Sequence, residues 1–139
     1  MPGKSVLATV TTTVVCVMPV FLVGGLAVQI ADELGFSPAG LGLAVSAYFG
    51  ASALSSVPAG ALVERYGPVR AATVGIGLVA TCLLAIAVAA RSLPVLVALL
   101  TASAAANALG QLASNAALSR VPAHRQGLSF GIKQAAIPA

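Results

Sequence analysis

Charge is what this sequence has least of. Among its 139 residues, 7 are Lys or Arg and 3 are Asp or Glu, so only 7% are charged, while 59% are hydrophobic. A water-soluble domain has roughly a quarter of its residues charged. This composition, with a mean hydropathy of +1.04, excludes an ordinary soluble fold. It predicts that lipid surrounds much of the chain.

Tryptophan is absent, and aromatic residues make up 4% of the chain. The net charge is +4, but the sequence contains no basic stripe interleaved with aromatic residues, which is the usual pattern of nucleic-acid-binding surfaces. We therefore expect no nucleic-acid partner.

Groups suited to catalysis or metal binding are equally scarce. Three acids and one histidine cannot assemble a Ser-His-Asp set, a carboxylate pair or a metal cluster. Cys16 and Cys82 each lie in an apolar run, so packing is their expected role. Gly75, Gly77 and Ala80 match a dinucleotide fingerprint, but no strand precedes them, and close helix packing is the preferred interpretation. We expect no enzyme activity, no catalytic residue, no metal and no cofactor.

Four uncharged runs dominate the chain, over residues 5–31, 34–63, 71–90 and 92–119. Each has at least the roughly 20 residues that a helix needs to cross the hydrocarbon, and none alternates with period two as a barrel strand does. Ser37 before Pro38, and Ser92 before Pro94, are signals for helix starts. The sequence thus predicts an all-α fold, a polytopic membrane helical bundle. The expected transmembrane helices cover residues about 5–31, 38–62, 71–90 and 94–118.

The basic residues favour a cytoplasmic N-terminus. With that orientation the outer connections carry Arg91 beside Asp32 and Glu33. The inner ends of the spans carry most of the basic side chains, which are Lys4, Arg65, Arg70, Arg120 and Arg125. Because inner connections are enriched in Lys and Arg, we expect a multi-pass protein of the cell membrane with its N-terminus in the cytosol.

A fifth apolar stretch covers residues about 127–139 and is too short to cross the bilayer. As a helix, a dozen residues extend less than about 20 Å, whereas the hydrocarbon core is about 30 Å thick. We therefore expect a truncated fifth helix, and interpret the chain as the front part of a longer protein.

The connection between the second and third expected spans concentrates charge. From Gly60 to Arg70 it contains the carboxylate of Glu64 and two guanidiniums, and Gly67-Pro68 supplies a bend. A tight cytoplasmic turn that obeys the positive-inside bias accounts for the arginines and the bend. That interpretation does not account for the glutamate.

This connection resembles the signature of the major facilitator superfamily between its second and third helices, G-x-x-x-[DE]-[RK]-x-G-x-[RK]-[RK]. The matching residues are Gly60, Glu64, Arg65, Gly67 and Arg70, with Val69 at one of the two final basic positions. The segments AYFGASALSSVPAGALVERYG and VPAHRQGLSFGIKQAAIP also look like the family's second helix and the entry to its fifth.

The resemblance implies a twelve-helix transporter made of two six-helix halves that rock about a central site. This chain is then a partial N-terminal half of that fold, comprising helices one to four and the start of helix five. The resemblance also implies a conformational lock, in which Glu64 engages basic loop groups and a helix end of the other half to hold the outward-open state.

Polar residues recur every fourth position on the fourth expected helix, at Ser103, Asn107, Gln111 and Asn115. This spacing places them in one stripe on a helix otherwise rich in Ala, Leu and Val. Carboxamides facing lipid are costly, so the stripe predicts either a cavity lining or hydrogen bonds between helices. Both alternatives stay open.

Lys133 and Gln134 lie near the start of the fifth expected helix. An ionisable residue within a span is a functional-site hypothesis, because a lysine at mid-membrane costs about 2.5–3.5 kcal/mol even on lenient scales. The alternative is that Lys133 snorkels to the cytoplasmic surface. If it faces a cavity, its ammonium suits an anionic substrate such as a carboxylate. The candidate residues for the substrate cavity are Asn107, Gln111, Asn115, Lys133 and Gln134.

Two functions fit these patterns. The first is a secondary active transporter of a small solute, of the major facilitator type, present as an N-terminal fragment that is inactive alone. The second is a self-contained four-helix membrane protein, acting as a homo-oligomeric exporter or as a structural or regulatory subunit. The exporter mechanism needs an acidic residue within a span, and all three acids lie at expected helix ends. The expected partners are the lipid bilayer, the missing C-terminal half and a small-molecule substrate.

Overall fold

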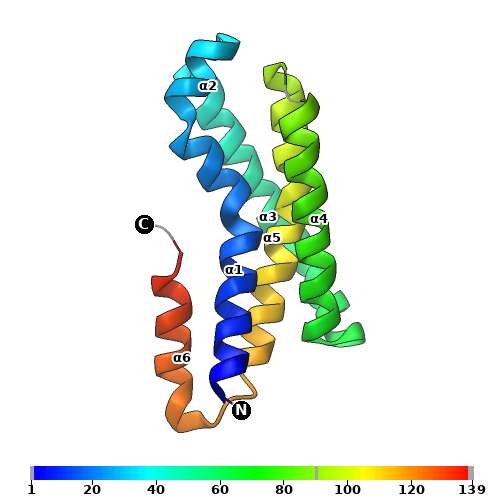
Figure 1. The fold of residues 1–139 in the computed structure, drawn as a ribbon. Helices are drawn as coiled ribbons and strands as arrows, with labels where there is room; N and C mark the ends of the chain where they lie inside the picture. The colour runs from blue at the N-terminus through cyan, green and yellow to red at the C-terminus, as the bar shows by residue number, and fades with distance from the viewer. Residues whose placement is uncertain (1, 90, 138–139) are drawn as a thin grey trace.

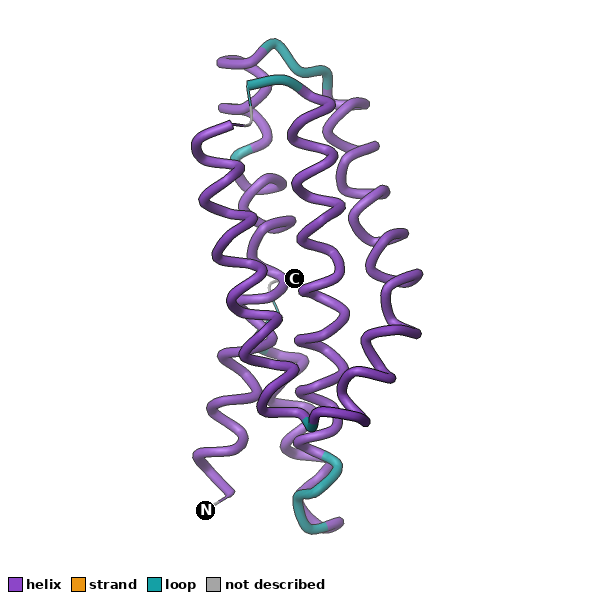
Figure 2. Tube along the Cα trace, turned by 90° about the vertical axis from the view of Figure 1, so that its right-hand side faces the viewer, coloured by secondary structure: helices purple, strands orange, loops and turns teal. Residues whose placement is uncertain are grey.

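The computed structural model describes residues 2–89 and 91–137, and within these ranges the chain is helical apart from short connections (Figure 1; Figure 2). The helices are α1 (Pro2–Gly25), α2 (Ala27–Leu34), α3 (Pro38–Tyr66), α4 (Pro68–Ala89), α5 (Leu93–Leu118) and α6 (Ala123–Ala135). Four of them, α1, α3, α4 and α5, are long and apolar enough to span a membrane. The predicted all-α membrane bundle is confirmed.

The first expected span, over residues 5–31, is interrupted in the structure. Leu26 separates α1 from α2, with φ −99° and ψ 13°, directly after the pair Gly24-Gly25. Glycine is a poor helix former, which explains a break at this point. Backbone hydrogen bonds still cross the break, from Leu26 N–H to Leu22 C=O at 2.9 Å and from Ile30 N–H to Leu26 C=O at 2.8 Å.

The starts of α3 and α5 differ in their capping. The Ser37 hydroxyl accepts a hydrogen bond from the Gly40 N–H at 3.0 Å, which satisfies one of the free donors of the first turn of α3. Ser92 occupies the same position before α5, but its side chain makes no capping hydrogen bond. The helix start predicted at Ser92 is therefore correct, although the serine side chain does not cap the helix.

The turn between α3 and α4 is a single residue, Gly67, with φ +85°. Glycine adopts this conformation without the strain that a Cβ brings, and Pro68 starts the next helix at once. Helix α3 therefore continues to Tyr66, beyond the expected end at residue 62. Helix α4 starts at Pro68 instead of residue 71.

The other helix bounds lie close to the expected ones. Helix α5 covers Leu93–Leu118, and α6 starts at Ala123, four residues before the expected 127. Residue 90, at the expected end of the third span, and residues 138–139, at the expected end of the fifth, lie outside the described residues.

Helix α5 is the packing centre of the bundle, because its contacts with α3, α4 and α1 are the three most extensive between helices. Its buried positions include small residues on most sides, such as Ala104, Ala106, Ala108 and Ala113. Small side chains allow helix backbones to approach closely, which drives association where lipid removes the hydrophobic term.

Two glycines, Gly75 and Gly110, lie at contacts between α5 and its neighbours. A Cβ added at Gly75 of α4 would lie 3.4 Å from the Ala106 carbonyl oxygen of α5, whereas one added at Gly77 would meet open space. The helix-packing interpretation is thus correct for Gly75. Cys16, which is completely buried, packs on Gly110 of α5, in agreement with its expected packing role.

The outer surface is apolar. Leu54, Val57 and Val69 are 82%, 79% and 78% exposed, respectively. Soluble monomers rarely expose large apolar surfaces, so this exterior is suited to lipid.

The connections lie at two opposite ends. The N-terminus, the α3–α4 turn and the α5–α6 connection are at one end of the bundle, and α2 and the α4–α5 connection are at the other (Figure 1). The first of these ends carries Glu64, Arg65, Arg70, Arg120 and Arg125, and we call it the basic end.

Candidate functional site

Lys133 of α6 is buried inside the bundle, with 2% of its surface exposed. Its Nζ donates hydrogen bonds to Gln111 Oε1 at 2.8 Å and to Asn115 Oδ1 at 2.7 Å, both on α5. The ammonium is therefore turned toward α5 and does not extend to the surface. The snorkelling alternative is wrong.

The spacing of the two amides on α5 explains this geometry. Residues four apart on a helix are neighbours on one face, so Gln111 and Asn115 present their oxygens to the same ammonium. Both are neutral, and an ammonium has three donors. The acids of the chain lie elsewhere, because Asp32 and Glu33 are exposed on α2 and Glu64 is exposed near the end of α3. Lys133 is thus a buried positive charge held by neutral partners within the described part of the chain.

The rest of the polar stripe has a different role. The Ser103 hydroxyl donates to Leu100 C=O of its own helix at 2.7 Å. The Asn107 Nδ2 donates to Ser52 Oγ of α3 at 2.8 Å, while its buried Oδ1 has no hydrogen-bond partner among the described residues. The structure therefore divides the stripe. Its first half makes local and interhelical hydrogen bonds, and its second half holds Lys133.

Gln134 is not part of this cluster. It follows Lys133 on α6 and its side chain is exposed, because consecutive residues on a helix point about 100° apart. Of the five candidate cavity residues, the structure brings together Lys133, Gln111 and Asn115. It places Asn107 at the contact between α3 and α5.

A second polar contact, between α1 and α5, includes Ser114, which sequence reasoning missed. The Thr13 hydroxyl donates to Ser114 Oγ at 3.2 Å, and the Ser114 hydroxyl donates to Thr9 C=O at 3.4 Å. The Tyr48 hydroxyl likewise donates to Cys16 C=O at 3.3 Å, joining α3 to α1. Single serines and threonines in Ala-rich helices have no spacing that distinguishes such contacts beforehand.

The charged side chains of the α3–α4 turn, at the basic end, lie on the surface of the bundle. Glu64 and Arg65 lie on the last turn of α3 and Arg70 on the first turn of α4, and all three side chains are exposed. The guanidinium of Arg65 lies over the Tyr66 ring, 5.4 Å from its centroid, at a distance typical of a cation–π contact. Gly60, one turn before Glu64, is half-buried and faces Leu112 of α5.

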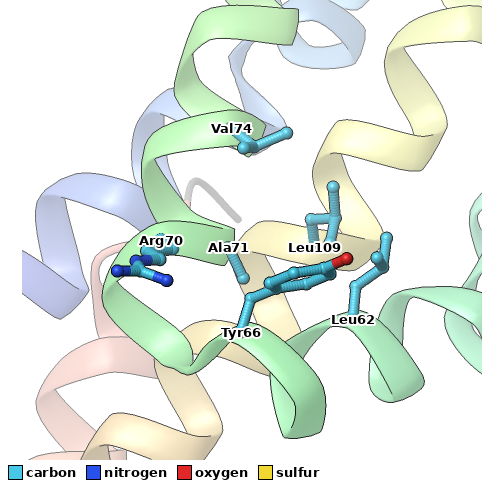
Figure 3. Close-up of a pocket in the computed structure, with 6 residues that line it drawn as sticks. All are labelled: Leu62, Tyr66, Arg70, Ala71, Val74 and Leu109. Carbon is cyan, nitrogen blue, oxygen red and sulfur yellow. The ribbon is translucent and has the colours of Figure 1, made fainter.

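A pocket of about 280 Å³ lies beside this turn, between α3, α4 and α5. It is lined by Leu62, Tyr66, Arg70, Ala71, Val74 and Leu109. Figure 3 shows the Tyr66 ring close to Leu62 and Leu109, with the guanidinium of Arg70 directed away from these apolar side chains. Small-molecule sites combine apolar walls with a few converging polar groups. The lining of this pocket lacks such convergence.

Comparison with known families identifies the fold. The family model of the Major Facilitator Superfamily matches residues 9–139, which is nearly the whole chain. The chain belongs to the Major Facilitator Superfamily. The match includes both the charged turn and the Lys133 cluster. Comparisons with curated proteins and with solved structures give no significant match.

Membership of the Major Facilitator Superfamily agrees with the four apolar helices, and together they describe a multi-pass membrane protein of the transporter type. The signature residues of the superfamily lie together in this chain, from Gly60 on α3 to Arg70 on α4, around the one-residue turn at Gly67.

Proposed function

We propose that this chain is part of a secondary active transporter that moves a small anionic solute by alternating access, and that Lys133, Gln111 and Asn115 form part of its solute site. The observation that carries the proposal is the buried ammonium of Lys133, whose two hydrogen-bond acceptors are both neutral amides. A buried charge without a counter-charge is costly. An anionic solute would supply that charge.

The geometry suits a carboxylate. Gln111 and Asn115 use two of the three ammonium donors, which fixes the direction of Nζ and leaves a third donor for a solute oxygen. A hydrogen bond between two charged groups is roughly twice as strong as one between neutral groups. The amide Nδ2 of Asn115, on an exposed side chain, is a further donor for the second carboxylate oxygen.

The proposal includes a partner half. Solute sites in transporters built from repeats lie near mid-membrane between the repeats, so this cluster would supply one wall of the site and the C-terminal half the other. The chain would lie in the cell membrane with its basic end in the cytosol, as the positive-inside rule favours.

Glu64, Arg65 and Arg70 would then form the conformational lock, with Gly60 and Gly67 shaping the turn. A carboxylate at the membrane edge gains from nearby guanidiniums and from the N-terminus of a facing helix, by about 0.3–2 kcal/mol. The exposure of Glu64 leaves it accessible to such a helix. The partner helix would come from the other half.

Solute binding tests the proposal directly. The purified chain in detergent is heated with a panel of small carboxylates, inorganic phosphate, organic cations and neutral sugars. A solute that binds the folded state at about 100 times its Kd adds about 2.7 kcal/mol of stability and raises the unfolding temperature. We expect stabilisation by at least one carboxylate, its loss in Lys133→Gln, and no change in Lys4→Gln, which removes an exposed charge. Stabilisation by cations alone, or an unchanged carboxylate response in Lys133→Gln, would overturn the anionic site.

Two further measurements address the extent of the protein. An open reading frame that continues into more apolar spans would support the proposed missing half. A stable, stoichiometric homodimer in detergent that transports solute without any further segment would favour the self-contained four-helix protein instead.

A further inference from the structure

Gln126 of α6 bonds to the connection that joins α6 to α5. Its side-chain Nε2 donates to Val121 C=O at 2.9 Å and to Ser119 C=O at 3.1 Å. Both carbonyls follow Leu118, the last residue of α5, where no further helical turn supplies N–H donors. One side-chain amide thus ties the start of α6 to the end of α5.

Lys133 makes the second attachment of α6 to α5. It lies seven residues after Gln126, which is two helical turns and therefore nearly the same face of α6. Its partners Asn115 and Gln111 lie four and eight residues before Ser119, and α5 and α6 run in opposite directions (Figure 1). The two attachments are therefore fixed points of one antiparallel helix pair.

The register of this helix pair decides where the ammonium lies. Advancing α6 by one residue against α5 moves its side chains about 1.5 Å along the axis and turns them by about 100°. The hydrogen bonds of Lys133 Nζ, at 2.7 and 2.8 Å, do not survive such a change. Among the described residues, side-chain hydrogen bonds tie α6 to α5 and to the connection only at Gln126 and Lys133. Gln126 is thus the polar group outside the cluster that holds the register.

We propose that Gln126 is a positioning residue for the Lys133 cluster: its amide sets the register of α6 against α5 and so places Nζ between Gln111 and Asn115. Binding groups need to be held within about 0.5 Å of their working geometry by the residues around them. Gln126 acts on the solute through Lys133 alone, because its own donors are used by the connection. This effect on the solute rests on the function proposed above, whereas the effect on Lys133 does not.

The scarcity of lysine makes the register measurable. Lys4 and Lys133 are the two lysines of the chain, so a Lys4→Arg background leaves Lys133 as the single one. The purified chain in detergent is treated with an acetylating N-hydroxysuccinimide ester, and mass spectrometry follows the modified fraction of the peptide that contains Lys133. Because Lys133 is buried and hydrogen-bonded, we expect slow acetylation.

Variants of Gln126 separate its donors from its shape. Gln126→Met keeps the length of the side chain without a donor, and should accelerate the acetylation of Lys133 at least about tenfold, as the loss of one hydrogen bond to a charged group implies. Gln126→Glu, which accepts hydrogen bonds but donates none when ionised, should do the same, and Gln126→Arg, which supplies donors again, should restore the protection. Gln29→Met, at an exposed glutamine of α2, is the control and should react like the parent chain. Gln126→Asn, which is one methylene shorter, repeats the test in case Gln126→Met does not fold.

Unchanged acetylation of Lys133 in Gln126→Met and Gln126→Glu would overturn the positioning role, even where the unfolding temperature falls. Acetylation as fast in Gln126→Arg as in Gln126→Met would also overturn it, because the donors would then have no part in the effect. In the solute measurement, Gln126→Met should weaken carboxylate binding about tenfold. Failure of every carboxylate to bind the parent chain would contradict the proposed solute and leave the acetylation result for Gln126 unaffected, so the two proposals fail separately.

Discussion

Cys16 of α1 lies directly against Gly110 of α5. A Cβ placed on Gly110 would lie 2.5 Å from Cys16 Sγ and 2.7 Å from Cys16 Cβ. Neither atom can move away freely, since Cys16 is completely buried and its short side chain follows the backbone of α1. The absence of a side chain at residue 110 is therefore what allows α1 and α5 to pack.

Gly110→Ala should destabilise the bundle. The added methyl group overlaps Cys16 and forces the two helices apart, and overpacking of this kind costs typically about 1–3 kcal/mol. Gly77→Ala is the control, because its Cβ meets open space. The measurement is the unfolding temperature of each variant in detergent. A Gly110→Ala variant as stable as Gly77→Ala would contradict the close packing.

Lys133→Met should stabilise the isolated chain while removing carboxylate binding. Replacing buried ionic groups by apolar residues of similar volume is often neutral or stabilising by about 1–4 kcal/mol. Unfolding temperatures with and without carboxylate measure both effects. A variant several kcal/mol less stable than the parent chain would show that Lys133 has a structural counter-charge, which contradicts the proposed role of the solute.

Asn107 and Ser52 should be energetically coupled. Their hydrogen bond joins α5 to α3, and bonds of this kind between membrane helices contribute about 0.6 kcal/mol on average. A double-mutant cycle with Asn107→Ala and Ser52→Ala measures the coupling through unfolding in detergent. The same cycle with Asn107 and Ser56, whose hydroxyl bonds to its own helix at Ala53 C=O, is the control and should be additive. Additive effects in both cycles would show that the hydrogen bond between Asn107 and Ser52 does not stabilise the bundle.

Glu64→Gln should impair the conformational cycle and leave solute affinity intact. It removes the carboxylate of the proposed lock while keeping the shape of the side chain. In the completed transporter we expect slower uptake, with unchanged carboxylate stabilisation. Glu33→Gln, an exposed glutamate at the other end of the bundle, should have no effect on either. Normal uptake by Glu64→Gln would exclude the lock.

The helices were predictable from the sequence because lipid imposes a simple rule. Uncharged runs of sufficient length form the long helices. The runs that end before Glu64 and before Arg91 match α3 and α4 to within a few residues at each end. The break at Leu26 was not predicted, because a glycine pair inside an apolar run also occurs in continuous helices. The extension of α3 to Tyr66 was missed because charged residues can remain helical until a glycine ends the helix.

The candidate site was predictable in part. The spacing of Gln111 and Asn115 indicated one face of a helix, and the charge of Lys133 marked it as exceptional. Which polar residues meet depends on how α6 packs against α5, and one sequence does not contain that information. Asn107 lies in the same stripe but contacts α3, and Ser114 lies outside the stripe but contacts α1.

The proposed placement of the charged turn in the cytosol sets the orientation of the whole bundle, and cysteine labelling tests it. Tyr66→Cys and Glu33→Cys are made in a background where Cys16 and Cys82 are replaced by alanine. A membrane-impermeant maleimide is then added to right-side-out and inside-out membrane vesicles. We predict that residue 66 reacts only in inside-out vesicles and residue 33 only in right-side-out vesicles. Labelling of residue 66 from the outside, or of both residues from the same side, would contradict the account.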